Sequence, residues 1–405
     1  MADLAQIGRS AWDRLVRASL PSPDSRPSPL SQTREAGAPQ PHGPSPELAA
    51  FLRYDFLEAL ERTGCVGRGT GWQPAHLTLW RGRELTAAAP LYVKSHSYGE
   101  YVFDWAWADA YQRHGLRYYP KLLCAVPFTP VTGPRLLAID APARDALAKA
   151  LLAQAREARL SSLHLLFPAA DEARVLEGAG LTLRRSVQFH WRNAGYDDFE
   201  QFLSTLAQPK RKKIRAERRK VAQAGVRFTR LLGREIGEAH WDFFFRCYES
   251  TYAAHGSTPY LTREFFLAIG ERMPEHLVLV IAHRDARPIA ASLLVRDATR
   301  LYGRYWGALE RVDCLHFETA FYQSIEAAIE LRVEVLEGGA QGEHKMSRGF
   351  LPEPTCSAHW LAEPAFADAV DRFLAREGAM VDGYIDELRE RSPFARAPAG
   401  VRSSA

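Results

Sequence analysis

The sequence predicts an α/β protein, more closely an α+β fold with two domains in tandem. Strand and helix patterns alternate along the whole chain, which is typical of this class. The chain has 405 residues, of which 46% are hydrophobic and 25% charged, enough for two globular cores. The two halves also share a rough plan, in which hairpin strands precede an aromatic strand (SYGEYVF, then LYGRYWG), a helix and a later buried strand (LHLLF, then VEVLE). We interpret this repetition as a duplicated domain.

The first domain is expected over residues 1–195. Residues 1–20 and 47–62 have the apolar spacing of amphipathic helices. Between them, Pro21–Pro46 holds eight prolines and almost nothing apolar, so we expect a flexible insertion there. The strands predicted after it are His76–Trp80, Thr86–Val93, Tyr98–Phe103, Tyr118–Val126, Leu163–Phe167 and Ser186–Trp191, with helices at Asp104–His114, Asp145–Arg159 and Asp171–Gly178.

The second domain is expected over residues 196–392, and 393–405 as a disordered tail. Helices are predicted at Phe199–Leu206, Lys210–Ala224, Ile236–Ala254, Thr262–Arg272 and Phe366–Glu390. Strands are predicted at Phe228–Leu231, Leu277–His283, Pro288–Arg296 and Leu301–Trp306, the last three as an antiparallel meander. A helix at Cys314–Leu331, a buried strand at Val333–Leu336 and a glycine-rich loop at Gly338–Gly349 then follow.

Cysteine usage and hydropathy limit the class of protein. The five cysteines are spread widely and form no CxxC or Cys/His spacing, which favours reduced thiols and predicts no metal site. The sequence has no apolar leader and no apolar run near the roughly 20 residues of a membrane span. We therefore expect a cytoplasmic protein with at most peripheral membrane contact.

Positive charge is concentrated in one predicted helix. Lys210–Lys220 carries eight basic residues and Glu217, a local charge of +7 in a chain whose net charge is +4. This helix is either a solvated face or a contact for phosphates on tRNA, a coenzyme or anionic lipid head groups. No aromatic residue interleaves with the basic ones, which argues against base stacking. Lys210, Arg211 and Lys213 are its candidate donor contacts, and DNA is not an expected partner.

The loop Gly338–Gly349 carries more potential chemistry than any other stretch. Glu343, His344 and Lys345 offer a base, a titratable imidazole and a cation in succession, and Gln341 and Arg348 flank them. The glycines Gly338, Gly339 and Gly342 allow backbone N–H groups to approach a donor closely. We expect Arg304 and Tyr305 nearby as substrate contacts, although strand packing would also explain them.

Two further charged residues are candidates for the site. Glu318 lies in the middle of the apolar arc of its helix, where a carboxylate needs a partner. It is either ion-paired to an arginine such as Arg304, or it is a general base or a substrate-amine anchor whose pKa burial raises. Lys121, between Pro120 and apolar residues, is either a contact for a phosphate or carboxylate or a surface lysine.

Several motifs together resemble the FemAB-like family of peptidoglycan biosynthesis or recognition proteins. They are GWQPAHL (71–77), YYPKLLCAVPFTPVTGPRLL (118–137), the basic helix, LYGRYWG, LHFE and GAQGEHKMSRGFLP. The resemblance implies two tandem GNAT-like domains, mostly antiparallel sheets flanked by helices, in a bacterial protein. It implies acyl or amino-acyl transfer to an amine, with acyl-CoA or aminoacyl-tRNA as donor, and it adds weight to Lys345. Neither half contains the Gln/Arg-x-x-Gly-x-Gly/Ala loop that binds coenzyme A pyrophosphate.

The function we predict is an N-acyltransferase that acts on a small molecule or a peptidoglycan precursor. Glu318 or Glu343 would take the amine proton, and His344 and Lys345 complete the catalytic candidates. The alternative is a non-catalytic module that recognises a cell-wall precursor or another anionic glycoconjugate. A third reading is an RNA-binding protein that uses the basic helix.

Overall fold

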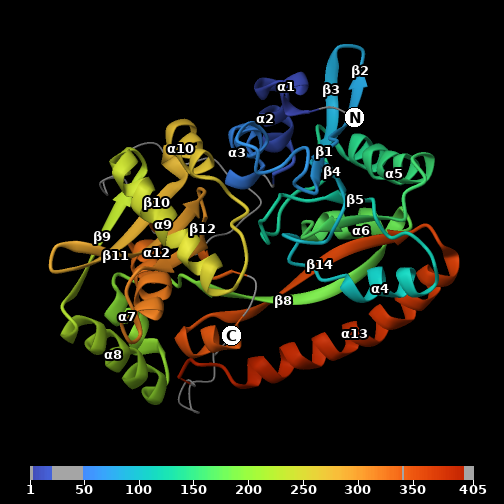
Figure 1. Cartoon of the computed structure of the whole chain (residues 1–405). Helices are drawn as coiled ribbons and strands as arrows, with labels where there is room; N and C mark the ends of the chain where they lie inside the picture. Colours follow the sequence, from blue (N-terminus) through green and yellow to red (C-terminus); the bar gives the residue numbers. More distant parts are fainter. Residues whose placement is uncertain (1–2, 21–48, 340–341, 396–405) are drawn as a thin grey trace, which may run out of the picture.

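One mixed, mostly antiparallel sheet runs through both halves of the molecule (Figure 1). The computed structural model describes residues 3–20, 49–339 and 342–395. Across the large sheet the strands follow the order β1 (Trp72–Pro74), β4 (Leu91–Lys94), β5 (Lys121–Cys124), β7 (Ser162–Leu166), β14 (Leu351–Leu361), β8 (Thr182–Arg192), β13 (Val335–Glu337), β12 (Arg300–Ala308), β11 (Arg287–Arg296), β10 (Leu277–Arg284) and β9 (Val226–Leu232). A small sheet contains β2 (Leu77–Arg81), β3 (Glu84–Ala89) and β6 (Leu137–Ala138). The predicted fold class is confirmed.

Helices cover both faces of the sheet. In the first half these are α1 (Leu4–Ile7), α2 (Arg9–Ala18), α3 (Tyr54–Arg62), α4 (Trp105–Arg113), α5 (Ala141–Glu157) and α6 (Ala170–Gly178). In the second half they are α7 (Phe199–Thr205), α8 (Gln208–Gln223), α9 (Glu238–Ala254), α10 (Arg263–Arg272), and α11 (Leu315–Phe317) and α12 (Gln323–Glu330) with a π-helical turn, η5 (Glu318–Tyr322), between them. The long α13 (Pro364–Glu390) runs beneath both halves in Figure 1. Within the described ranges, no helix is both long and apolar enough to cross a bilayer.

Two strands cross between the halves. β8, from the first half of the sequence, pairs with β13, and β14, from the end of the chain, lies between β7 and β8. Figure 1 shows both strands running from one half toward the other. The expected division between residues 195 and 196 stays a prediction, because a strand from each side of it completes the sheet on the other side.

A shared core joins the halves on one face of the sheet. Phe51 packs edge-on against Tyr302, and Phe56 against Phe265, with ring centroids 5.1 and 5.5 Å apart. Phe128, from the loop at residues 127–133, stacks on Tyr260 of the second half at 4.8 Å. The loop 127–133 therefore lies against the second half, close to β12.

The structure corrects three local predictions. Tyr98–Phe103 is a loop and not a strand. The strand predicted at Thr86–Val93 is interrupted at Pro90, so β3 and β4 belong to different sheets. The tail expected from residue 393 is ordered at its start, since Phe394 bridges Leu206. The remainder of that tail and the insertion 21–46 lie outside the described residues.

The sequence pattern did not predict β14, because Pro352 and Pro354 argue against a central strand. In the structure both prolines lie where β14 pairs with β8 alone, and pairing with β7 begins only at Ser357. The prolines thus occupy a stretch with one open side, where a missing N–H leaves no ladder bond unmade.

Candidate functional site

The candidate site lies where two parallel strands of the second half diverge. β12 and β13 are paired only from Arg300 to Tyr302 and from Val335 to Glu337. Beyond that point a bulge displaces Arg304 from the β11 register, and the other strand ends in Gly338 and Gly339. Side chains from β8, β12, β13 and the 3₁₀ helix η6 (Glu343–Arg348) therefore meet at the divergence.

Lys345 is a buried cation at this divergence. Its side chain is 3% exposed, and its Nζ donates to the Gly339 carbonyl at 2.9 Å. Among the described residues no carboxylate pairs with it, and burial lowers its pKa to about 8. A Cβ at Gly338 would lie 3.0 Å from the Phe350 ring and 3.3 Å from Lys345 Cδ, so a larger residue would have to displace these side chains. Gly339 (φ +85°) and Gly342 (φ +117°) both adopt conformations that favour glycine.

Glu337 and His190 are site residues that the sequence analysis missed. Glu337 ends β13, is 3% exposed and accepts from Arg300 Nη1 at 2.7 Å. Burial raises its pKa to about 7 against the opposing effect of Arg300. His190 stands opposite it on β8, with Nε2 3.9 Å from Glu337 Oε2, and burial lowers the pKa of His190 to about 3, so it is neutral. The available signal was a carboxylate that ends a buried strand immediately before two glycines.

Arg304 and Tyr305 lie on the β12 side of the divergence. Arg304 Nη2 donates to the Phe128 carbonyl at 2.5 Å and lies 3.5 Å from the Tyr305 hydroxyl. Tyr305 packs edge-on against Tyr248 in the shared core. Both residues are thus near the junction of the halves, as expected for substrate contacts, and their role stays a prediction.

Glu343 and His344 point away from Lys345. Glu343 is half-exposed, pairs with Arg391 at 3.1 Å and accepts from Tyr384 at 3.3 Å, both on or next to α13. His344 is exposed and lies 5.8 Å from the Phe321 ring. Because successive residues of a 3₁₀ helix face different sides, the three neighbours expected to act together are separated. Gln341 lies outside the described residues.

Glu318 is ion-paired, but to Arg218 of the basic helix and not to Arg304. The closest contact of the pair is 3.1 Å, and Gln323 donates to the same carboxylate at 3.0 Å. Burial raises the pKa of Glu318, and Arg218 opposes that shift. These contacts favour the ion-pair explanation of Glu318, and its role as a base stays a prediction without geometric support.

Arg348 braces η6 against the basic helix. Its Nη2 donates to both oxygens of Glu217 at 3.1 and 3.0 Å, and its Nε to the Tyr322 hydroxyl at 3.1 Å. Nη1 donates to the His344 carbonyl at 2.9 Å, and the guanidinium carbon lies 3.6 Å from the Phe317 ring centroid. Arg348 is 2% exposed, so its contacts are those of a structural brace.

Lys121 lies far from these residues in the fold, inside the first half. It is fully buried and not a surface lysine, which corrects that alternative. Its Nζ donates to Ser97 at 2.8 Å, to Glu100 at 2.9 Å and to Asp104 at 2.5 Å. These three hydrogen bonds use all three ammonium protons, so Lys121 anchors the loop at residues 97–104. Lys121 therefore has no N–H left to donate to a substrate.

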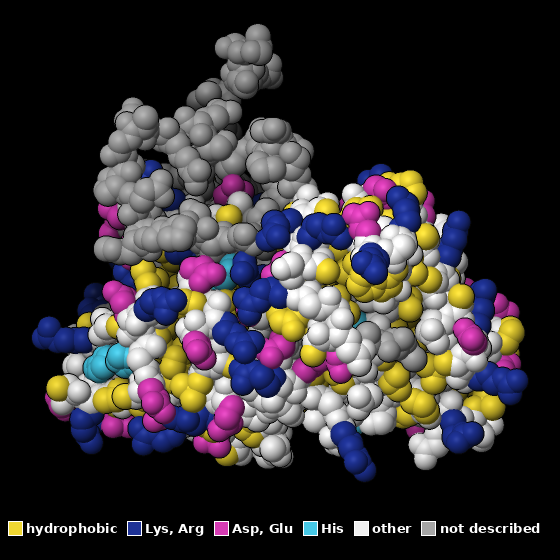
Figure 2. All heavy atoms as spheres, turned by 90° about the horizontal axis from the view of Figure 1, so that it is seen from above, with side chains coloured by type: hydrophobic (Ala, Val, Ile, Leu, Met, Phe, Trp, Pro, Cys, Tyr) yellow, Lys and Arg dark blue, Asp and Glu magenta, His cyan; other side chains and the backbone are white. Residues whose placement is uncertain are grey.

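The basic helix α8 exposes part of its charge. Ile214, Glu217 and Val221 face inward, whereas Lys212, Lys213, Arg219 and Lys220 are exposed and make no ion pair with the described residues. Lys210 is half-buried, and Arg211 donates to the carbonyls of Ser204 and Leu206. Elsewhere, on the face seen from above in Figure 2, Lys and Arg are interspersed with Asp and Glu. The exposed side of α8 is therefore a local concentration of positive charge.

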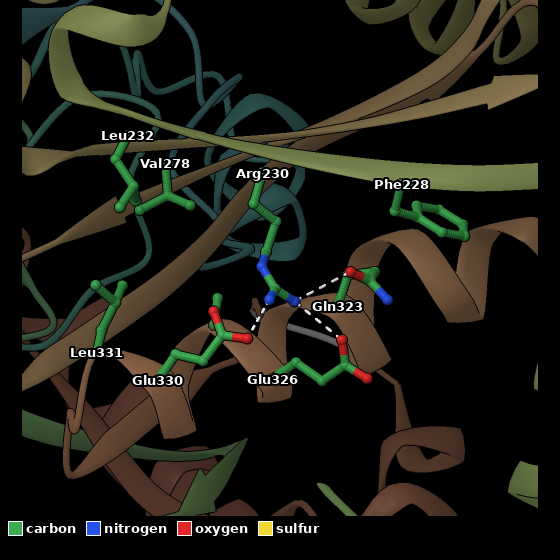
Figure 3. Close-up of a pocket in the computed structure, with 9 residues that line it drawn as sticks. Phe228, Arg230, Leu232, Val278, Gln323, Glu326, Glu330 and Leu331 are labelled. Atoms are coloured by element: carbon green, nitrogen blue, oxygen red, sulfur yellow. Dashed lines mark hydrogen bonds and ion pairs between the residues drawn. The ribbon is translucent and has the colours of Figure 1, made fainter. Parts of the chain in front are cut away.

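Two hollows accompany these residues. One, of about 510 Å³, lies between β9, β10 and α12, where Figure 3 shows Arg230 directed at Gln323, Glu326 and Glu330. Its cation is already neutralised by Glu326 at 2.9 Å and by Glu330. The other, of about 340 Å³, lies at the junction of the halves and is lined by Ser97, Tyr98, Gly99, Tyr101, Phe103, Trp105 and Tyr260. We call the second the aromatic pocket. No metal-binding group of His, Cys, Asp or Glu occurs among the residues described.

Known proteins share this architecture. A model of the FemAB-like family, described as acting in peptidoglycan biosynthesis or recognition, matches residues 4–396. L-PGS from Bacillus licheniformis superimposes with a TM-score of 0.50 at 8% identity, over 83% of this chain and 99% of that one. The C-terminal DUF2156 domain of an Agrobacterium fabrum protein gives 0.50 at 11%, over 78% and 96%. FemX gives 0.46 at 10%, over 81% and 96%. No curated protein matches the chain in sequence.

Fold and family together define the class, a mixed α/β protein of peptidoglycan biosynthesis or recognition. The chain belongs to the FemAB-like family.

Proposed function

We propose that the chain transfers an acyl or amino-acyl group to an amine at the point where β12 and β13 diverge. The observation that carries this proposal is Lys345, a buried ammonium with no carboxylate partner among the described residues. A cation held in this way stabilises a negative charge that appears only during reaction. The tetrahedral intermediate of acyl transfer carries such a charge on its oxygen.

Glu337 is the base that the geometry favours. The neutral amine attacks the carbonyl carbon of a thioester or ester, forms the new C–N bond and loses one proton. With a pKa of about 7, Glu337 can accept that proton near neutral pH and return it to the departing sulfur or oxygen as the old bond breaks. Lys345 holds the oxyanion in between. All three candidate carboxylates are paired with an arginine, Glu337 with Arg300, Glu318 with Arg218 and Glu343 with Arg391. Glu337 is favoured because it ends β13 at the strand divergence, whereas Glu343 is directed at α13 and Glu318 at the basic helix.

Replacing Lys345 with methionine tests this assignment. We expect turnover to fall about 10²–10³-fold, the cost of removing one oxyanion-stabilising donor. The measurement is mass-spectrometric detection of the acylated amine, with a soluble muropeptide as acceptor and acyl-CoA or aminoacyl-tRNA as donor. Glu343→Gln is the matched control on the same 3₁₀ helix and should stay within about twofold of the wild type.

Full turnover in the folded Lys345→Met variant would remove the proposal. If neither donor reacts and no thioester binds, but the muropeptide binds tightly, the chain is a recognition module. The missing pyrophosphate loop favours that second function.

The donor phosphates are expected at the exposed side of α8. Both donor classes carry phosphates, and Lys212, Lys213 and Lys220 are free to neutralise them. Replacing these three by glutamine should lower the slope of log K against log salt by about 2 for bulk tRNA. Lys149→Gln, at an exposed position of α5, is the control and should leave the slope unchanged. A shallow slope in the wild-type protein would argue for acyl-CoA, which calorimetric titration with a thioester would then detect.

A further inference from the structure

Arg304 is a guanidinium with unmet bonding capacity. Nη2 has the Phe128 carbonyl and a long contact to the Tyr305 hydroxyl, while Nε is shut off from solvent without a hydrogen-bond partner. In the described part of the chain, no carboxylate forms an ion pair with it. A shielded N–H without an acceptor is costly, which makes Arg304 a candidate for contact with a ligand.

Three other arginines show how the fold can satisfy a guanidinium that is shielded from solvent. Arg348 is paired with Glu217, and Arg218 with Glu318 and Glu326. Arg135 is 1% exposed and has no ion pair among the described residues, yet its three nitrogens donate to four backbone carbonyls between 2.6 and 3.1 Å. Arg304 has neither solution. Its positive charge remains available to a ligand.

The surroundings of Arg304 connect it to the aromatic pocket. The Phe128 carbonyl accepts its hydrogen bond, and the Phe128 ring stacks on Tyr260 with an interplanar angle of 9°. Tyr260 is one wall of the pocket, whose opposite wall is the loop 97–105 of the first half. No charged residue lines the pocket itself. A ligand that enters there meets aromatic rings first. Lys121 and Lys94 are hydrogen-bonded to the pocket residues Ser97 and Tyr98, but both are neutralised by Glu100. Arg304, which lies behind Phe128, has no ion pair with a described carboxylate.

Chain position agrees with a ligand role. Arg304 lies at the bulge of β12, beside Gly303, whose carbonyl faces Gly339 at the strand divergence. β-Bulges re-aim a side chain and are over-represented next to active sites. The bulge turns Arg304 toward the junction of the halves, where it contacts the Phe128 carbonyl.

We propose that Arg304 binds an anionic group, a carboxylate or a phosphate, that the amine acceptor carries. This inference rests on the proposed function, because it assigns the substrate class of the same site. The planar guanidinium offers parallel N–H groups that match either anion in bidentate geometry. The acceptor is then an amine with a nearby acid group, and its uncharged part occupies the aromatic pocket.

The first test compares two arginines, the partly buried Arg304 and the buried Arg348, which differ in having a carboxylate partner. Arg304→Met and Arg348→Met remove the same side chain, in low-salt buffer without added anion. Arg304→Met should unfold at or above the wild-type temperature, because it removes an uncompensated charge. Arg348→Met should unfold at least about 5 °C lower, because it leaves the buried Glu217 carboxylate without its counter-charge. A loss in Arg304→Met as large as that in Arg348→Met, or a failure to fold, would show a structural arginine and overturn the proposal.

The second test uses acetate and inorganic phosphate as probes of the two anion classes. Addition of the matching anion should raise the unfolding temperature of the wild-type protein saturably, and the Arg304→Met response should lack that component. The anion that raises the unfolding temperature in this way identifies whether the site binds a carboxylate or a phosphate. Arg304→Lys, which keeps the charge without the planar fork, should bind about tenfold more weakly. Identical responses of the wild type and Arg304→Met to both anions would refute the site.

Calorimetry with a muropeptide completes the design. The form with free carboxylates should bind the wild type at least about tenfold more tightly than its amidated form, and Arg304→Met should not distinguish them. Equal binding of both forms by the wild type would exclude recognition of a carboxylate. The titration with inorganic phosphate would then decide whether the site binds a phosphate. None of these measurements requires turnover, so a failure of acyl transfer and a failure of anion recognition appear separately.

Discussion

Replacing Arg348 with methionine is expected to lower the free energy of unfolding by about 3–5 kcal/mol. The variant leaves the carboxylate of Glu217 inside the protein, at 8% exposure, without its cation. It also removes the donors to Tyr322 and to the His344 carbonyl. Urea unfolding followed by fluorescence measures the difference.

The control for this prediction is Arg391→Met. Arg391 pairs with Glu343 at the surface, where both side chains are about half exposed, so the loss should be below about 1 kcal/mol. Equal losses in the two variants would mean that the brace contributes no more than a surface ion pair. Glu217→Gln should also be destabilising, since it leaves the buried Arg348 without a counter-charge.

Replacing Glu337 with glutamine is expected to lower turnover about 10²–10⁴-fold and to change the pH profile. The pKa of Glu337 is about 7, so a base role makes wild-type activity rise through pH 7. Lys345 must be charged, and its pKa of about 8 makes activity fall above pH 8. The wild-type profile should therefore be a narrow bell between these values, and the residual activity of the variant should lack the rising limb.

Stability against pH gives an independent reading of the same carboxyl. The folded pKa of Glu337 exceeds its ordinary value of 4.5, so the folded state binds more protons between the two values. Its contribution to stability is therefore present below pH 4.5 and is lost as pH rises toward 7. Glu337→Gln should remove that slope, whereas Glu343→Gln should retain it. A slope that persists in Glu337→Gln would assign the raised pKa to another group.

The central topology could not be predicted from local patterns. Period-2 and period-3.6 spacing placed the meander β10–β12 and the helices around it, because these elements bury one face against a neighbour close in sequence. The sequence pattern did not predict β14, because its prolines are tolerated only where a neighbouring strand is absent. Its partners β7 and β8 lie far away in the chain, and nothing local encodes that pairing.

The candidate site, too, could be predicted only in part from the sequence. Its loop, its glycines and Lys345 stand out in the sequence as polar groups after a buried strand. The sequence could not reveal that Glu343 faces α13, that Glu318 meets Arg218 or that Glu337 loses its solvent, because each of these facts depends on an element distant along the chain.

The sequence by itself determined the class of this protein, its family and the loop that delivers Lys345. These depend on composition, spacing and motif, which are local properties of the chain. Only the tertiary structure decided which charges are neutralised and which remain available. Arg304 and Arg348 look alike in sequence, and they differ because the fold brings a carboxylate to one of them and, in the described residues, none to the other. The burial of a charged side chain and the presence of its counter-charge depend on packing between segments that lie far apart along the chain.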